Sequence, residues 1–184
     1  MLNLYKFYGK PKTLPLYIDM GKSLEMIQPF KLGQWNESIS RADLDPVLHI
    51  IAKIPKLAYY YTMLFVKDRW PEGEKAIAAD PEYSFLYTRY VIKGRWKEAE
   101  PTILKNTATS IEYINQILNH DPNWPHPKGE WPEAMQHALK TPWDAYYYAV
   151  NALKRVWPEA HSIIKTDIHA WQKYCKAFDY SERD

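Results

Sequence analysis

The sequence predicts an all-α protein made of tandem helix pairs, stacked into a short curved array behind a small irregular or hairpin N-terminal leader. One observation is a recurring tryptophan, which stands at Trp35, Trp70, Trp96, Trp131 and Trp157. Its intervals alternate between 35 and 26 residues, so that two neighbouring units always make 61 residues. A fixed period of this size is typical of repeat architectures. The other observation is composition: 14 prolines against 6 glycines suit helices that begin at proline.

The tryptophan belongs to a short motif that predicts the start of a helix. Proline is tolerated at the first helical position, and an acidic residue in the first turn interacts favourably with the helix dipole. Because this acid recurs in every unit, we interpret it as structural and not as catalytic. The copies are Arg69-Trp70-Pro71-Glu72, Glu130-Trp131-Pro132-Glu133, Val156-Trp157-Pro158-Glu159, the degenerate Arg95-Trp96-Lys97-Glu98 and the more distant Gln34-Trp35-Asn36-Glu37.

A second helix start follows eleven residues after the tryptophan in three units, at Asp45-Pro46, Asp80-Pro81 and Thr141-Pro142. Each has a capping side chain before the proline. We therefore expect a short helix over residues 71–79 and a longer one over 81–93, which Gly94 would end in a left-handed conformation. The apolar face of the longer helix is predicted at helical spacing, and a tyrosine recurs 17 residues after four of the tryptophans. The face comprises Tyr83, Leu86, Tyr87, Tyr90 and Val91, and the recurring tyrosines are Tyr87, Tyr113, Tyr148 and Tyr174.

These landmarks divide the chain into a leader, residues 1–34, packed on a helical repeat domain, residues 35–184. The units start near residues 35, 70, 96, 131 and 157. The longer units hold about nine extra residues, which precede Pro55 in the first unit and fall at residues 118–129 in the unit after Trp96. There the segment Asn119–Gly129, with three prolines, is predicted to be a stiff loop.

The net charge and the cysteine content exclude few classes of function. The 184 residues carry a formal net charge of +2 without a long basic run, which neither supports nor excludes nucleic acid. A lone Cys175 excludes an internal disulfide framework, fits a reducing compartment and is expected in the core. Neither a signal peptide nor a membrane-spanning segment is expected, so we predict a cytoplasmic protein.

The chain resembles tandem helical-repeat proteins of bacteriophages that are themselves uncharacterised. The resemblance rests on Arg69-Trp70-Pro71-Glu72, on Asp80-Pro81-Glu82-Tyr83 and on the helix end at Val91–Trp96, and it covers roughly residues 35–178. The aromatic leader Leu4-Tyr5-Lys6-Phe7-Tyr8 is similar to leaders that precede such arrays. The resemblance implies a helical array from a phage, working in the bacterial host cytoplasm. It supplies no catalytic residues.

Searches for reactive motifs fail. Gly21-Lys22-Ser23 has the end of a phosphate-binding loop, but the glycine required five residues earlier is Leu16. The six histidines form no His-Glu-x-x-His pair, and His120, Asp121 and His126 share only a loop. We therefore predict no catalytic residues, no metal site and no cofactor.

Aromatic residues that depart from the repeat are the candidates for a binding surface. The periodic tryptophans are expected in the core, because periodic aromatics pack. Tyr59-Tyr60-Tyr61 and Tyr146-Tyr147-Tyr148 are different, since three consecutive residues span about 300° of a helix and cannot all face one core. Trp124 in the loop is a non-repeat tryptophan that either locks the loop or is presented to a partner. The candidate partner-binding residues are Tyr60, Tyr147, Trp124 and His126.

Three functions are weighed on these grounds. The leading hypothesis is a non-enzymatic interaction protein that binds and modulates a host or phage protein through this aromatic surface. The alternative is binding of nucleic acid or nucleotides through the repeat junctions, at Lys93, Arg95, Lys154 and Arg155. An enzyme is the least favoured, because no convergent acid–base set is recognisable.

Overall fold

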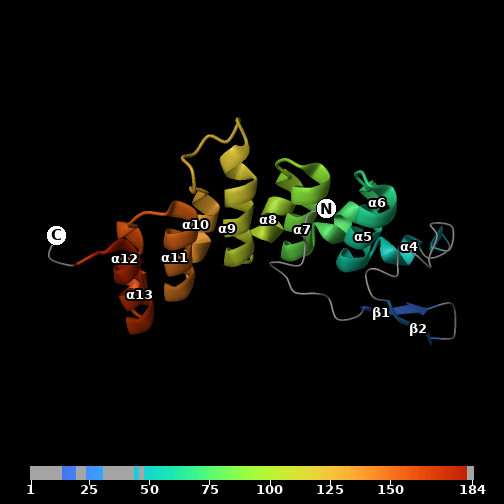
Figure 1. Ribbon diagram of the computed structural model, residues 1–184, viewed down its shortest axis with the longest axis horizontal. Coiled ribbons are helices and arrows are strands. Elements are labelled where there is room, and N and C mark those ends of the chain that lie inside the picture. Colours follow the sequence, from blue (N-terminus) through green and yellow to red (C-terminus); the bar gives the residue numbers. More distant parts are fainter. Residues whose placement is uncertain (1–13, 20–23, 31–43, 46–47, 182–184) are drawn as a thin grey trace. The chain divides into compact units, whose positions relative to one another are not determined.

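The computed structural model describes residues 14–19, 24–30, 44–45 and 48–181, and it divides into two compact units, residues 1–74 and 75–184 (Figure 1). Apart from one pair of strands, every regular element in these ranges is helical, so the all-α class is confirmed for the described residues from 44 onward. The predicted boundary between leader and repeat domain, at residues 34 and 35, lies outside the described residues.

The first unit contains the strand pair and the first helices. Strands β1 (Leu14–Asp19) and β2 (Leu24–Phe30) are antiparallel, with Tyr17 opposite Met26. Of the two forms expected for the leader, irregular or hairpin, these residues adopt a hairpin. Three helices follow, α4 (Leu48–Ile51), α5 (Pro55–Tyr61) and the π-helical turn η3 (Thr62–Val66). Helix α6 (Pro71–Ile77) begins in this unit and ends in the second.

The second unit consists of short helices that alternate with longer ones. Helix α7 packs against α8 and α9, α9 packs against α10 and α11, and α11 packs against α12 and α13. The elements are α7 (Pro81–Tyr87), η4 (Thr88–Ile92), η5 (Lys97–Ala99), α8 (Glu100–Ile103), α9 (Thr107–Gln116), η6 (Leu118–His120), α10 (Pro132–Ala138), α11 (Pro142–Tyr148), η7 (Ala149–Leu153), η8 (Pro158–Ala160), α12 (His161–Ile164) and α13 (Ile168–Phe178).

The longer helices begin where capping side chains predict. Asp80 accepts a hydrogen bond from the Tyr83 backbone N–H at 3.0 Å. Thr141 accepts one from the Asp144 N–H at 3.1 Å, and proline occupies the first turn in both helices. These two starts are therefore confirmed, since each cap satisfies an amide that has no partner inside the helix.

The ends of these helices differ from the prediction. Helices α5, α7 and α11 each widen into a five-residue π-helical turn, after which a lysine is left-handed, with φ of 59° at Lys67, 57° at Lys93 and 54° at Lys154. The expectation that Gly94 would be the left-handed residue is wrong. The π turn places the Lys93 N–H on the Thr88 carbonyl, five residues earlier, at 2.7 Å, so the reversal comes one residue sooner.

The buried face of α7 is also broader than predicted. Leu86 and Tyr87 are buried, but Tyr83 is only half-buried, while Phe85 and Thr88 are fully enclosed. The reason is that α7 has helices on more than one side, namely α8 and α9. A single stripe describes a helix that covers one surface, whereas α7 contacts two helices and exposes only Glu82.

The periodic tryptophans form the core, as predicted. Exposed fractions are 9% for Trp70, 4% for Trp96, 2% for Trp131 and 2% for Trp157. Each ring packs against a tyrosine of an earlier helix, with centroids 4.7–5.6 Å apart; the pairs are Tyr61–Trp70, Tyr87–Trp96, Tyr113–Trp131 and Tyr148–Trp157. Trp35 lies outside the described residues.

The recurring tyrosine has a specific task. The tryptophan backbone N–H precedes a short helix and has no partner within that helix. The hydroxyl of the tyrosine 17 residues later accepts it, at 3.0 Å from Trp96 to Tyr113, 3.3 Å from Trp131 to Tyr148 and 2.6 Å from Trp157 to Tyr174. These three repeat motifs are thus each tied to the next long helix by a buried hydrogen bond.

We expect Tyr148→Phe to lower the free energy of unfolding by about 1–3 kcal/mol, because it strands the buried Trp131 N–H. The lost hydroxyl also donates to the Gly129 carbonyl at 3.1 Å. Tyr61 is the matched control: it ends the other tyrosine triplet and is 1% exposed, but its hydroxyl has no hydrogen-bond partner among the described residues. Tyr61→Phe should therefore be neutral or stabilising. Urea titration of both variants tests this, and equal losses would contradict it.

Candidate functional site

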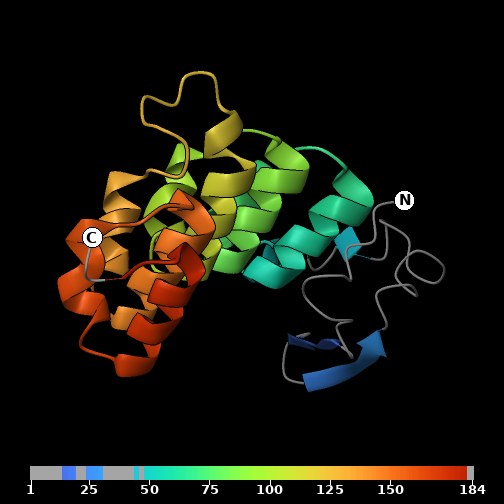
Figure 2. The same ribbon diagram turned by 60° about the vertical axis from the view of Figure 1, so that its left-hand side comes forward.

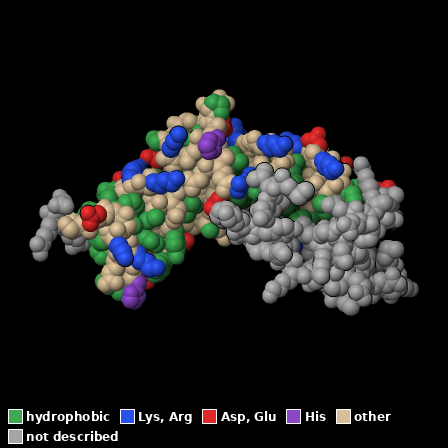
Figure 3. Space-filling model, viewed as in Figure 1, with side chains coloured by type: hydrophobic (Ala, Val, Ile, Leu, Met, Phe, Trp, Pro, Cys, Tyr) green, Lys and Arg blue, Asp and Glu red, His purple; other side chains and the backbone are tan. Residues whose placement is uncertain are grey.

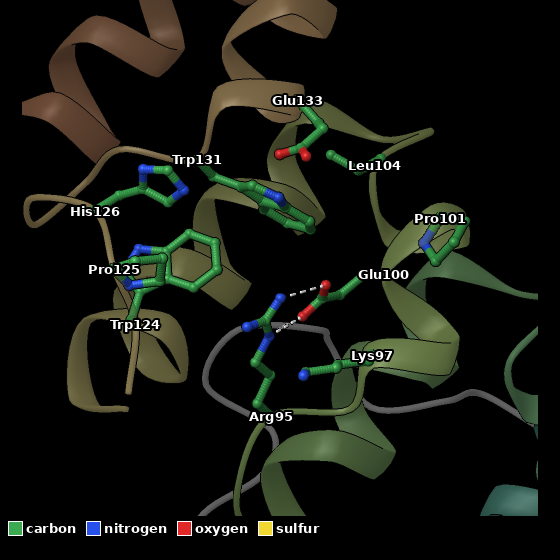
Figure 4. A pocket seen from close by; sticks show the side chains of 10 residues that line it. All are labelled: Arg95, Lys97, Glu100, Pro101, Leu104, Trp124, Pro125, His126, Trp131 and Glu133. Atoms are coloured by element: carbon green, nitrogen blue, oxygen red, sulfur yellow. Dashed lines mark hydrogen bonds and ion pairs between the residues drawn. The ribbon is translucent and has the colours of Figure 1, made fainter. Parts of the chain in front are cut away.

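A pocket of about 360 Å³ opens beside the loop at residues 119–129, within the second unit. Figures 1 and 2 both show this loop projecting beyond the ends of α9 and α10. Three parts of the chain line the pocket: the segment around Trp96, the loop and the start of α10 (Figure 4). Its residues are Arg95, Lys97, Glu100, Pro101, Leu104, Trp124, Pro125, His126, Trp131 and Glu133.

The loop is fixed at its base and at its centre. The Gly129 N–H donates to the Asn119 side-chain oxygen at 2.8 Å, which joins the two ends of the loop. Gly129 has φ of 84° and passes so close to the Ala152 carbonyl that a Cβ would overlap it. Trp124 donates its indole N–H to the Glu130 carbonyl at 3.1 Å. These contacts hold the loop at its base and its centre, and Trp124 both bonds to the end of the loop and lines the pocket.

Arg95 connects the junction to the loop. Its guanidinium pairs with Glu100 through two hydrogen bonds, of 2.6 and 3.0 Å, and lies 4.8 Å from the centre of the Trp124 ring. The bonds to Glu100 raise the pKa of Arg95, although partial burial opposes them. Glu100 also accepts the Tyr113 hydroxyl at 3.1 Å, and burial raises the pKa of that tyrosine. The three groups form a fixed polar network beneath the aromatic wall.

The structure brings together two residues that the sequence proposes for one surface. His126 packs edge-on against Trp124, with ring centroids 5.0 Å apart, and Trp124 in turn meets Trp131 edge-on at 6.5 Å. His126 is exposed and Trp124 is half-buried. Both therefore combine accessibility with a fixed position, as expected of binding residues.

The other two candidates of that surface lie elsewhere. Tyr147 is 46% exposed on α11, where its ring contacts Trp143 at 5.9 Å and Tyr146 at 5.1 Å. Tyr60 belongs to the first unit and is half-buried, with its ring 5.3 Å from that of Tyr59. Neither is among the residues that line the pocket.

Of the four basic residues proposed for nucleic-acid binding, two form ion pairs and two are exposed lysines. Arg95 is paired with Glu100, and Arg155 is paired with Glu130 at 2.8 Å. Lys93 and Lys154 are exposed, and both hold the left-handed position at the end of a π turn. In Figure 3 the Lys and Arg side chains of the described residues are spread over the visible face and do not form one stripe.

Several pocket residues were missed by the sequence reasoning. Glu100 had a usable signal, because it follows Trp96 by four residues as Glu74 follows Trp70, and Arg69 pairs with Glu74 as Arg95 pairs with Glu100. Lys97 could also have been recognised from the sequence, because it stands where three other copies of the tryptophan motif have proline. Leu104 and Pro101 have no sequence feature that distinguishes them from other helix residues.

The volume and lining of the pocket resemble those of ligand-binding sites. In the described ranges no three His, Cys, Asp or Glu side chains are placed to hold a metal ion. None of the helices there is long and apolar enough to cross a membrane. The volume of the pocket is at the lower end of the range for ligand-binding sites. Its aromatic and apolar walls combine with a few charged groups, as is usual for such sites.

Comparison with models of known protein families, with curated protein sequences and with solved structures gave no match.

Proposed function

We propose that this chain is a non-enzymatic interaction protein of bacteriophage type, which binds and modulates a host or phage protein in the bacterial cytoplasm. The observation that carries the proposal is the pocket at Trp124, where an accessible aromatic wall is held in place by Arg95 and by the loop's own hydrogen bonds. Rigid aromatic side chains beside a concavity are the usual anchors of protein interfaces. The phage origin rests on the resemblance of the repeat motifs.

We further infer that the helix pairs stack in chain order into a short curved array. The contacts of α7 with α9, of α9 with α11 and of α11 with α13 support this inference. An array of this kind offers surface along its whole length. Within the second unit, the pocket lies where about nine extra residues fall, at residues 118–129.

Nucleic acid remains the second candidate and is less well supported. Arg95 and Arg155, two of its four cations, are already neutralised by Glu100 and Glu130. A strand of nucleic acid requires a continuous row of unpaired cations along its phosphates. The pocket instead offers charges of both signs, from Lys97 to Glu133.

A photo-crosslinking amino acid placed at position 126 tests the proposal in bacterial lysate. We expect one protein to become covalently attached, because His126 is exposed at the pocket rim. The matched control is the same amino acid at position 147, which is also exposed but lies outside the pocket. Equal labelling from both positions, or labelling of nucleic acid from position 126, would refute the assignment of the pocket.

A further inference from the structure

The pocket separates its charges. In Figure 4 Arg95 and Lys97 lie at one end of the pocket, Glu133 and Leu104 lie at the other, and Trp124 and Trp131 lie between them. These residues come from different parts of the repeat: Lys97 opens η5 and Glu133 lies in the first turn of α10. The pocket therefore carries basic groups at one end and an acidic group at the other, with aromatic rings between them.

The charged residues of the pocket differ in whether they already have an oppositely charged partner. The charge of Arg95 is neutralised by Glu100, so this pair serves the framework of the pocket. Lys97 and Glu133 are exposed, and neither takes part in a described ion pair. A partner that supplies the complementary charges would gain attraction at both ends without first breaking an existing pair.

We propose that the pocket binds a short extended peptide segment of a partner protein, with an acidic side chain facing Lys97, a bulky apolar side chain against Trp124, and a basic side chain facing Glu133. This inference rests on the proposed function and specifies the partner for the same site. The apolar residue supplies most of the affinity, because it is the group that becomes desolvated. The two charged residues select the sequence and its register.

Selection from a library of random twelve-residue peptides against the purified full chain tests the inference. The wild-type chain should enrich peptides with one acid and one base on opposite sides of an apolar residue. Lys97→Glu makes both ends acidic, so it should enrich bases on both sides. Glu133→Lys makes both ends basic, so it should enrich acids on both sides. Each substitution should lower the affinity for the peptides selected by the wild-type chain by about fivefold to tenfold, which is the effect expected from reversing one charge at the rim.

Charge reversals outside the pocket are the controls. Lys140→Glu and Glu159→Lys change exposed residues of the same types and should leave both the selected sequences and their affinities unchanged. Circular dichroism melting of each variant establishes that it is folded before selection.

The outcomes separate the inference from the proposed function. Flanking charges that stay the same in Lys97→Glu and Glu133→Lys would overturn the inference. The proposed function would then stand if the selected peptides still lost binding in Trp124→Ala and in the milder His126→Ala. Peptides that bind both of these variants as well as wild type, or the absence of any selected peptide, would overturn both.

Discussion

Gly129→Ala is expected to lower the free energy of unfolding by about 2–4 kcal/mol, from the left-handed backbone and from a displaced packing contact. Gly129 has φ of 84°, and a Cβ there would overlap the carbonyl oxygen of Ala152. Backbone, not a flexible side chain, blocks the space, so relief requires the loop to move. The movement would pull on the Asn119 bond to the Gly129 N–H and on the Tyr148 bond to its carbonyl.

Gly94 supplies the control for this substitution. Nothing lies within 4 Å of a Cβ at Gly94, and its φ lies outside the left-handed range. Gly94→Ala should therefore be neutral or slightly stabilising, because alanine reduces the freedom of the unfolded chain. Urea denaturation measures the free energy of unfolding of both variants. Similar stabilities for the two would mean that the loop is not held against Ala152.

The second large effect is a loss of stability in alkali. Burial is the main cause that raises the pKa of Tyr113 and of Tyr148. A group whose pKa is higher in the folded state stabilises the fold fully below its unfolded pKa, which is about 10 for tyrosine, and loses this contribution as the pH rises towards the folded value. We therefore expect the free energy of unfolding to be flat to about pH 9. Above pH 10 it should fall by up to about 1.4 kcal/mol per pH unit for each tyrosine.

Urea titrations between pH 7 and pH 11.5 measure this dependence. The double substitution Tyr113→Phe and Tyr148→Phe lowers stability at neutral pH, but it removes two titrating groups and should reduce the alkaline slope; Tyr174, whose pKa burial also raises, accounts for part of what is left. The comparison concerns slopes, so the lower starting stability does not affect it. A slope that persists undiminished in the double variant would assign the loss to other groups, such as lysines.

Sequence patterns anticipated the elements that rest on local chemistry. Asp80 and Thr141 cap helices because a side-chain oxygen before proline is the local requirement for a helix start. Trp131 and Trp157 are core because their spacing places them at equivalent points of a repeat. The left-handed Lys93 was not anticipated, since residue type favours Gly94 and the π turn that moves the reversal has no local signature.

The site was anticipated only in parts, because its residues meet through the path of the loop. Trp124 and His126 were found as departures from the repeat, whereas Arg95 was assigned to the competing nucleic-acid hypothesis. The loop returns across the junction and stacks Trp124 on Arg95, which spacing along the chain does not reveal. Glu133 was interpreted as a helix-start acid, and only its place at the pocket rim distinguishes it from the acids of the other repeats.

The most direct test of the central proposal is a pull-down of the tagged chain from bacterial lysate, with and without nuclease, read by mass spectrometry. Wild type and Trp124→Ala are compared, with Tyr147→Ala as a control outside the pocket. The account predicts one stoichiometric protein that survives nuclease, is retained by Tyr147→Ala and is lost with Trp124→Ala. Recovery of nucleic acid, or of many proteins that disappear with nuclease, would contradict it and favour the basic repeat junctions as the binding site.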